Sequence, residues 1–236
     1  MSPARLSVVG NEAVGPYALL RLRRGALEPG VPGQFFMLRP PGRLLPRPMS
    51  LCLAPVGELG FLVDPIGPGT RALTALEPGD EVDVLGPLGN GFRLDPERPL
   101  LVGGGIGVAP FPYLSERLGC PPALLGFRTA DHAEAAALVP NAEVVLEPTL
   151  VTDALAPGFD VLACGPEPML RALAVLARRW NVPCHLSLET PMACGVGICF
   201  SCVTPVRTAD GWDYRRVCVE GPVFDAACLA WNSGPV

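Results

Sequence analysis

Four cysteines near the C-terminal end constrain this chain more than any other feature. Cys194, Cys199 and Cys202 follow the spacing C-x4-C-x2-C, and Cys218 comes after fifteen intervening residues. This is the ligand spacing of plant-type [2Fe–2S] centres, in which four thiolates converge on two irons. Two glycines lie between the first two cysteines and allow the loop to wrap closely around a cluster. The spacing predicts a [2Fe–2S] site.

Two alternatives remain open for these cysteines. Zinc sites usually combine two short cysteine motifs that lie farther apart in the sequence. Here three cysteines share one nine-residue loop, so iron is favoured over zinc. Cys228 competes with Cys218 for the place of the fourth ligand. The sequence favours Cys218, which we expect in a strand ending in a turn, over Cys228, whose alanine-rich flank indicates a helix or a packing position.

The basic residues exclude several classes of enzyme. All 18 are arginines, so no lysine exists for a Schiff base, for a P-loop nucleoside triphosphatase or for a protein kinase. His132 and His185 are the only histidines, which excludes a multi-histidine metal site. The net charge is −5 and no basic block occurs, so we expect no binding to nucleic acid. No acid–base constellation stands out, and we assign no catalytic residue.

The distribution of apolar residues predicts a cytoplasmic protein with no membrane contact. No apolar run approaches the ~18–20 residues of a membrane span, and no signal-peptide core follows the first residues. A reducing cytoplasm disfavours structural disulfides, and the count of nine cysteines is odd. Clustered cysteines are therefore read first as metal ligands.

Residues 1–96 have the pattern of a small antiparallel β-barrel. Gly and Pro together make 56 of 236 residues (27 + 29), which indicates many short elements and tight turns. Apolar segments of strand length recur between these turns. The strands we expect are Tyr17–Leu22, Gln34–Leu38, Ser50–Leu53, Gly60–Val63 and Glu81–Leu85.

Residues 97–186 alternate strand and helix patterns, which predicts an α/β domain with a mostly parallel sheet. The expected strands are Pro99–Val102, Ala123–Phe127, Glu143–Leu146 and Asp160–Ala163, and the expected helices are Phe111–Leu118 and Glu167–Trp180. Residues 187–236 show little periodicity and hold the cysteine cluster. The fold class predicted is an α+β multidomain chain with these three segments.

Two glycine-containing turns follow strands of the α/β segment. Gly103, Gly104, Gly105 and Gly107 lie between a strand and a helix, where backbone can approach a pyrophosphate. The run is not G-x-G-x-x-G, because Pro110 takes the last position, so a plain tight turn is the alternative. Cys164-Gly165-Pro166 follows another strand and would face the crevice where open α/β sheets bind ligands.

The N-terminal segment carries a second pair of signals. Arg47-Pro48-Met49-Ser50 precedes an expected strand, and Gly67-Pro68-Gly69-Thr70 follows Phe61–Val63 at an expected helix start. Taken singly, each is a turn. Together, an arginine, exposed strand backbone and a Gly-Thr at a helix start suit a second phosphate-bearing cofactor.

These motifs carry a resemblance to a known family. R-P-M-S, G-x-G-T, G-G-G-I-G-V-A-P and C-G-P-E-P-M-L occur in the order of the ferredoxin–NADP reductase superfamily. The segment from Glu189 to Cys202, E-x-x-M-x-C-G-x-G-x-C-x-x-C, resembles the electron-transfer subunits of class 1B dihydroorotate dehydrogenases. The resemblance covers essentially the whole chain.

The resemblance implies a set of FAD-binding residues in the barrel. Arg47 would contact the pyrophosphate and Ser50 would lie near the flavin ring. Many relatives carry a tyrosine near position 64, where this chain has an aspartate. The full set implied is Arg47, Pro48, Met49, Ser50, Leu62, Val63, Asp64, Gly69 and Thr70.

The resemblance also implies where NAD(H) and the cluster bind. Gly103, Gly104, Gly105 and Gly107 would border the nicotinamide site together with Cys164, Gly165 and Pro166, and Cys194, Cys199, Cys202 and Cys218 would ligate [2Fe–2S]. Glu189 lies five residues before the first ligand, where it either approaches a cofactor or is simply exposed. Arg128 could contact the adenosine ribose, and we follow the family in expecting NADH.

The function implied is electron transfer in pyrimidine biosynthesis. Electrons would pass from an FMN-containing catalytic subunit that oxidises dihydroorotate, through [2Fe–2S] and FAD, to NAD⁺. The implied complex is a heterotetramer with two copies of each subunit. Three alternatives are kept. The first is a subunit of another NAD(P)H-dependent oxidoreductase, either of the ferredoxin–NADP oxidoreductase type or of the sulfhydrogenase type. The second is a free-standing diaphorase, and the third is a non-enzymatic zinc-binding module.

Overall fold

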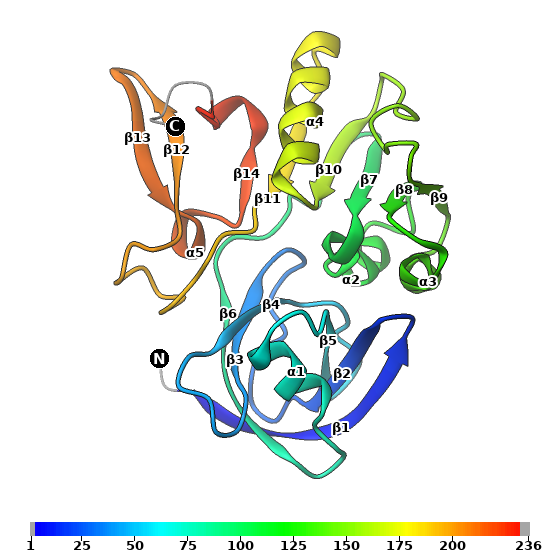
Figure 1. The fold of residues 1–236 in the computed structure, drawn as a ribbon. Helices are drawn as coiled ribbons and strands as arrows, with labels where there is room; N and C mark the ends of the chain where they lie inside the picture. The colour runs from blue at the N-terminus through cyan, green and yellow to red at the C-terminus, as the bar shows by residue number, and fades with distance from the viewer. Residues whose placement is uncertain (1–2, 232–236) are drawn as a thin grey trace.

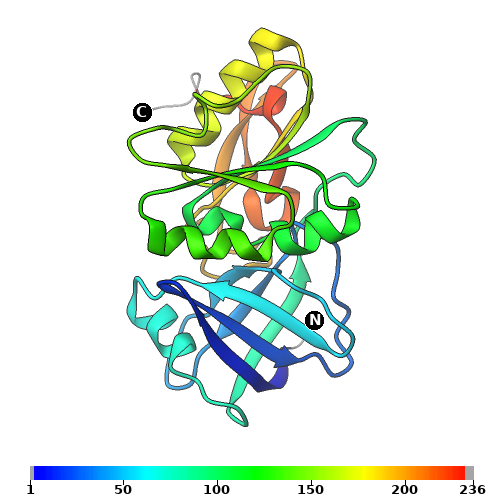
Figure 2. The same ribbon diagram turned by 90° about the vertical axis from the view of Figure 1, so that its right-hand side faces the viewer.

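Two six-stranded sheets and a two-stranded hairpin make up the strands of this protein, which a computed structural model describes over residues 3–231. In Figure 1 the N-terminal sheet lies at the bottom, the second sheet at the upper right and the hairpin at the upper left. Figure 2 shows the second sheet and its helices stacked on the N-terminal sheet. Within the described residues no helix is both long enough and apolar enough to cross a membrane.

The N-terminal sheet is an antiparallel barrel, as the turn-rich sequence predicted. Its strand order is β4-β3-β6-β1-β2-β5. The segment after β4 closes it, because the Cys52 N–H donates to the Gly60 carbonyl at 2.9 Å. The elements are β1 (Ala4–Val14), β2 (Tyr17–Arg23), β3 (Phe35–Arg39), β4 (Arg47–Ser50), β5 (Glu58–Val63), α1 (Pro68–Thr74) and β6 (Glu81–Leu88).

One strand of the barrel differs from the sequence prediction. The expected strand at Ser50–Leu53 begins earlier, and Arg47–Ser50, expected to precede it, is itself β4. Pro48 lacks an N–H, yet β4 is the edge strand of the sheet and pairs only with β3, so no ladder bond is lost on its outer side. The motif Arg47-Pro48-Met49-Ser50 therefore lies in a strand.

The second sheet is mostly parallel, again as predicted. Its order is β14-β11-β10-β7-β8-β9, and only the edge strand β14 (Val223–Asp225) is antiparallel to its neighbour. The expected helix at Glu167–Trp180 is α4, with the expected bounds. The elements are β7 (Pro99–Gly104), η1 (Gly105–Val108), α2 (Phe111–Arg117), β8 (Ala123–Phe127), α3 (Ala130–Ala133), η2 (Glu134–Leu138), β9 (Ala142–Leu146), β10 (Asp160–Cys164), α4 and β11 (Cys184–Ser187).

The strand order creates a crevice between β7 and β10. From β7 the chain continues to β8 and β9 on one side, whereas β10 and β11 lie on the other. The loops that follow β7 and β10 therefore leave the sheet in opposite directions. This is the topological switch point at which open α/β sheets bind ligands.

The C-terminal segment is more regular than its sequence predicted. It contains β12 (Val203–Thr208), β13 (Gly211–Arg216), α5 (Val217–Glu220), β14 (Val223–Asp225) and η3 (Ala226–Cys228). Cys218 lies in the short helix α5, and not in a strand as expected. The Glu220 carboxylate explains the turn, because it accepts the Arg216 N–H at 2.6 Å and so closes one helical turn.

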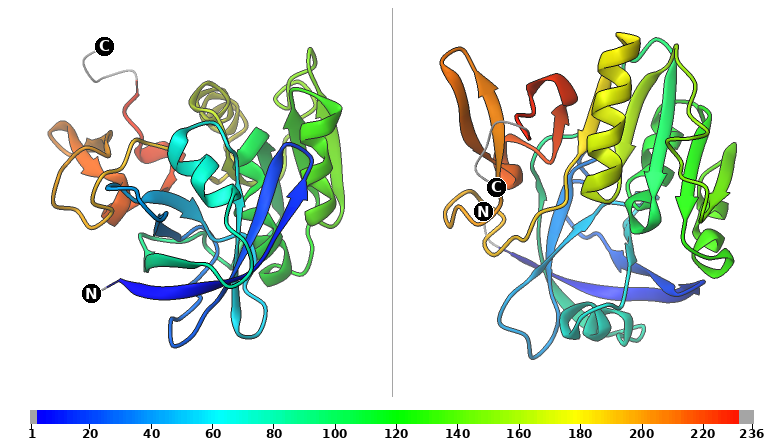
Figure 3. Two further views of the ribbon diagram at one scale, coloured as in Figure 1. Left: turned by 60° about the horizontal axis from the view of Figure 1, so that its bottom comes forward. Right: turned by 45° about the horizontal axis from the view of Figure 1, so that its top comes forward.

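A shared core joins the three segments. Phe35 and Met37 of β3 belong to the same buried cluster as Leu170 of α4 and Phe224 of β14. Figure 3 shows the C-terminal segment beside both the barrel and α4. The expected segment boundary at 186/187 falls within β11.

The barrel core gives a direct stability test. Phe61 is fully buried on β5 and its ring meets that of Phe36 edge to face, with centroids 5.5 Å apart. We expect Phe61→Ala to lower the free energy of unfolding by about 3–5 kcal/mol in urea denaturation, because it leaves a large cavity. The exposed Val56→Ala serves as control and should change nothing. A loss below ~1 kcal/mol for Phe61→Ala would contradict this view of the core.

Candidate functional site

Two adjoining cavities lie between the barrel and the parallel sheet. The larger, here called the sheet cavity, has a volume of about 550 Å³, and the smaller, the barrel cavity, about 460 Å³. Both fall in the size range of cofactor sites. Asp64, Ile106 and Glu189 line both cavities. Ligands in the two cavities would therefore meet at these three residues.

The sheet cavity lies over the C-terminal ends of the parallel strands. Gly104 and Gly105 reach it from β7, Arg128 from β8, Glu147 from β9 and Pro166 from β10. Strand ends at the switch point are the usual place for a nucleotide in this architecture. The cavity therefore has the position expected of a dinucleotide site.

Close packing of two loops shapes the floor of this cavity. A Cβ on Gly107 would lie 2.4 Å from the Cys164 carbonyl oxygen, and one on Gly104 would lie 3.0 Å from Cδ of Pro166. Side chains at these positions would push the two loops apart. The G-G-G-I-G run and the C-G-P turn, distant in sequence, are thus in direct contact.

The predicted nucleotide residues divide into three groups. Gly104, Gly105 and Pro166 line the sheet cavity, and Cys164 lines the barrel cavity. Gly103, Gly107 and Gly165 line neither. Gly103 is buried in β7, where a Cβ would meet Leu125 and Phe111 at 2.8 Å. These glycines pack the loops against the sheet.

The barrel cavity is lined by much of the predicted FAD set. Its walls include Pro48, Met49, Ser50, Leu62, Asp64 and Thr70. Arg47, Val63 and Gly69 lie outside the lining. Nevertheless, a Cβ on Gly69 would lie only 2.4 Å from Nε of Arg47, so the guanidinium packs directly on the start of α1. An arginine beside the backbone at the start of a helix is a suitable partner for a phosphate.

An unpartnered hydroxyl supports a polar ligand in the barrel cavity. Oγ1 of Thr190 is buried and has no hydrogen-bond partner among the described residues, and Thr190 lines this cavity. Buried polar atoms are normally satisfied, so an orphan at a cavity wall indicates a ligand that supplies the missing partner. The mixture of apolar wall, polar atoms and nearby arginine fits FAD.

The junction of the cavities holds two acidic groups with perturbed pKa values. Burial raises the pKa of the Glu189 carboxyl, and the charge of Asp64 raises it further. Glu189 is exposed to the cavities, while the surrounding protein atoms still limit its solvation. Burial also raises the pKa of Asp64, and the charge of His132 opposes this.

Sequence reasoning missed Tyr17 and His132 at the edge of the sheet cavity. Their rings meet edge to face, with centroids 5.5 Å apart, although one comes from β2 and the other from α3. Burial and the charge of Asp64 raise the pKa of Tyr17 to about 12. No local pattern could have indicated a contact between residues so far apart along the chain.

The cysteine loop supplies the first of two thiol pairs, which consists of Cys194 and Cys199. Backbone N–H groups of Val196, Ile198 and Cys199 donate to Sγ of Cys194 at 3.4–3.5 Å. Hydrogen bonds from Ser201, and then from Cys194, lower the pKa of Cys199 to about 6. Donors of this kind stabilise thiolates, the form that binds metal.

The second thiol pair is Cys202 and Cys218, both buried. Burial raises the pKa of Cys218 to about 12, and the neighbouring Cys202 acts in the same direction. In residues 3–231, no three His, Cys, Asp or Glu side chains are grouped closely enough to hold a single metal ion. The four thiols lie as two pairs, an arrangement that fits two irons with two thiolates each. Cys228 is exposed on η3.

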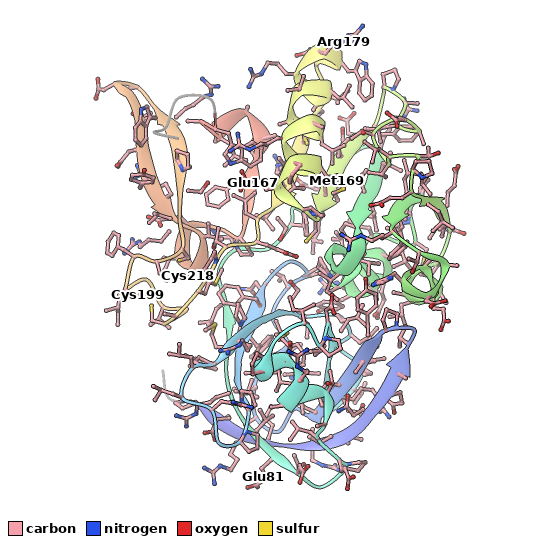
Figure 4. The ribbon with its side chains drawn as sticks, in the orientation of Figure 1. Glu81, Glu167, Met169, Arg179, Cys199 and Cys218 are labelled. Atoms are coloured by element: carbon pink, nitrogen blue, oxygen red, sulfur yellow. The ribbon has the colours of Figure 1, made fainter. Side chains whose placement is uncertain are left out.

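The cysteine loop rests on the barrel. A Cβ on Gly195 would lie 2.6 Å from Cγ of Met37, and Met37 pairs with Pro48 across β3 and β4. Gly195 has φ +70°, a conformation that favours glycine. Met192, two residues before Cys194, lines the barrel cavity. Figure 4 shows Cys199 and Cys218 above the barrel, on the side away from α3.

Comparison with known proteins agrees with this geometry. Residues 189–230 match the model of the iron–sulfur cluster binding domain of dihydroorotate dehydrogenase B. The matched range holds Glu189 and all four candidate ligands, and also Cys228.

Solved structures share the fold. A chain of the NADH-dependent reduced ferredoxin–NADP oxidoreductase is 26% identical, with a TM-score of 0.85, and the match covers 97% of this chain and 91% of that one. Phthalate dioxygenase reductase, 18% identical, has a TM-score of 0.65 over 92% of this chain and 94% of its own. The second likeness is one of fold alone.

Curated relatives are more similar in sequence. The protein of Bacillus caldolyticus is 42% identical over 94% of this chain and 96% of its own length, and that of Caldanaerobacter subterraneus is 36% identical over 82% and 84%. Both are named as the electron transfer subunit of dihydroorotate dehydrogenase B (NAD⁺). With such identity over nearly all of its length, the chain belongs to the family of electron-transfer subunits of NAD⁺-dependent dihydroorotate dehydrogenase B.

Proposed function

We propose that this chain transfers electrons between a dihydroorotate-oxidising subunit and NAD⁺ by means of a [2Fe–2S] cluster and FAD. One observation carries the proposal. The segment from Glu189 to Cys194 connects the two cavities with the cysteine loop. Glu189 lines both cavities, Met192 lines the barrel cavity, and Cys194 is the first cysteine of the loop. One short stretch of chain thus links all three binding places.

FAD occupies the barrel cavity in this proposal. Ser50 and Met49 of β4 lie along it, and Arg47 with the backbone of Gly69 and Thr70 binds its phosphates. Thr190 supplies a hydroxyl that otherwise has no partner. Leu62, Val63 and Asp64 keep their proposed place beside the flavin.

NAD(H) occupies the sheet cavity. The backbone of Gly104 and Gly105 faces its pyrophosphate, while Gly107 and Cys164 keep the two loops in contact. The nicotinamide end reaches the junction at Glu189, where it adjoins the flavin. Bound FAD supplies the conversion between hydride and single-electron transfer, and the cluster supplies single-electron steps.

The partner is the catalytic subunit that the family name implies. We propose that it carries FMN and that two copies of each subunit assemble. Ile198 and Phe200 support a contact at the cysteine loop, because they are 78% and 61% exposed beside Cys199. Exposed apolar groups around a redox centre suit a protein interface. We place the complex in the cytoplasm, where thiols such as those of the five cysteines outside the proposed ligand set persist.

Reconstitution tests the function. The purified chain, loaded with FAD and iron–sulfur cluster, is mixed with the catalytic subunit of its own organism, and NADH formation from dihydroorotate and NAD⁺ is followed by absorbance. We expect turnover only when both subunits are present. Turnover by the catalytic subunit alone, or none by the mixture although both subunits hold their cofactors, would refute the proposal.

The ligand set is tested by paired cysteine variants. We expect Cys218→Ser to lose most of the iron, because one iron then lacks a thiolate, whereas Cys228→Ser keeps about two irons per chain. Iron analysis and the visible spectrum measure the effect. If Cys228→Ser lost iron and Cys218→Ser kept it, Cys228 would be the fourth ligand instead.

The phosphate contact is tested with Arg47 of β4 and with Arg43 of the loop before it. Arg47→Gln should weaken FAD binding about tenfold, because a charge-assisted contact is lost. Arg43→Gln, an exposed change four residues earlier, is the control and should leave FAD binding unchanged. Flavin fluorescence during dilution measures dissociation. Equal retention of FAD by both variants would remove Arg47 from the site.

A further inference from the structure

Two carboxylates at the junction of the cavities lack an arginine partner among the described residues. Asp64 follows β5 of the barrel, and Glu189 follows β11 of the parallel sheet. No arginine of the described residues lies within ion-pair distance of either. By contrast, Glu147 on the far wall of the sheet cavity has Arg128 at 4.0 Å. The junction therefore carries uncompensated negative charge.

The two carboxylates influence each other. The charge of Asp64 raises the pKa of Glu189, so an ionised Asp64 opposes ionisation of its neighbour. The other charged or titratable groups of the cavity walls are Tyr17 of β2, Arg128 after β8, His132 of α3 and Glu147 after β9. The charge of His132 acts on Asp64, and the charge of Asp64 in turn raises the pKa of Tyr17.

A dinucleotide changes charge at one place when its redox state changes. The oxidised nicotinamide ring carries a positive charge, and uptake of a hydride makes the ring neutral. The adenosine and pyrophosphate parts are the same in both states. A fixed negative charge next to the ring therefore attracts the oxidised form and leaves the reduced form almost unaffected.

We propose that Asp64 and Glu189 are specificity residues that make the site bind NAD⁺ in preference to NADH. The inference rests on the proposed function, which puts the nicotinamide ring at the junction that these two residues line. Asp64 provides the main attraction, and Glu189 adds to it. The bound acceptor is held by this charge, and the neutral product loses the attraction and leaves more easily.

The test compares two ligands that share the adenosine and pyrophosphate parts and differ at the nicotinamide ring, which is charged in one and neutral in the other. NAD⁺ is one, and tetrahydro-NAD, which has a neutral ring and cannot donate a hydride, stands for NADH. Dissociation constants are measured by calorimetry on the oxidised, FAD- and cluster-loaded chain, in one buffer at a fixed, mildly alkaline pH. The variants are Asp64→Asn and Glu189→Gln, which keep the side-chain shape, with Glu143→Gln of β9 as a control that lines neither cavity.

We expect Asp64→Asn to weaken NAD⁺ about fivefold and tetrahydro-NAD less than about twofold, because only the charged ring loses an attraction. Glu189→Gln should act in the same direction, and Glu143→Gln should change neither constant. Equal effects on both ligands, or none on either, in both junction variants would overturn the inference. If the wild-type chain bound neither dinucleotide while holding FAD, the proposed function itself would fail instead.

Discussion

The packing of the cysteine loop on the barrel is the interaction on which the rest of this structure depends. Gly195 lies so close to Met37 that a single added carbon would clash, and Met37 is a neighbour of the strand that lines the barrel cavity. Redox groups exchange electrons well only when the protein holds them close together and fixed. This contact holds the cysteine loop against the strands beside the barrel cavity.

A second contact does the same for the nucleotide side. Gly107 and the Cys164 carbonyl allow the loops after β7 and β10 to touch, and this fixes the floor of the sheet cavity. The resulting chain of sites runs from sheet cavity to barrel cavity to cysteine loop. Since one core cluster includes residues of β3, α4 and β14, the three segments form a single packed unit. The order of the sites is therefore built into the fold.

Sequence alone predicted the kinds of the two large sheets and several local features. The bounds of α4 followed from its apolar periodicity, and the cysteine spacing indicated the cluster. Where the sequence failed, the reasons differ between the two segments. Arg47–Ser50 becomes a strand because β3, an earlier segment of the chain, lies beside it. The Cys218 segment becomes a helix through a local contact, in which the Glu220 carboxylate accepts the Arg216 N–H four residues earlier.

The junction of the two cavities was the least predictable part of the site. Asp64 and Glu189 come together only because the barrel and the parallel sheet face each other there. Glu189 was visible in the sequence as a carboxylate before the first cysteine, but nothing local distinguished a cofactor contact from an exposed side chain. The meeting of Tyr17 with His132 depends on the same interface.

The central claim is that one chain holds FAD and [2Fe–2S] as a connected relay. Anaerobic reductive titration, followed by the visible spectrum, tests it most directly. The account predicts uptake of about three electrons per chain, two by the flavin and one by the cluster, and loss of both absorption bands with NADH alone. A protein that contains zinc, or one in which NADH bleaches the flavin while the oxidised cluster persists, would contradict it.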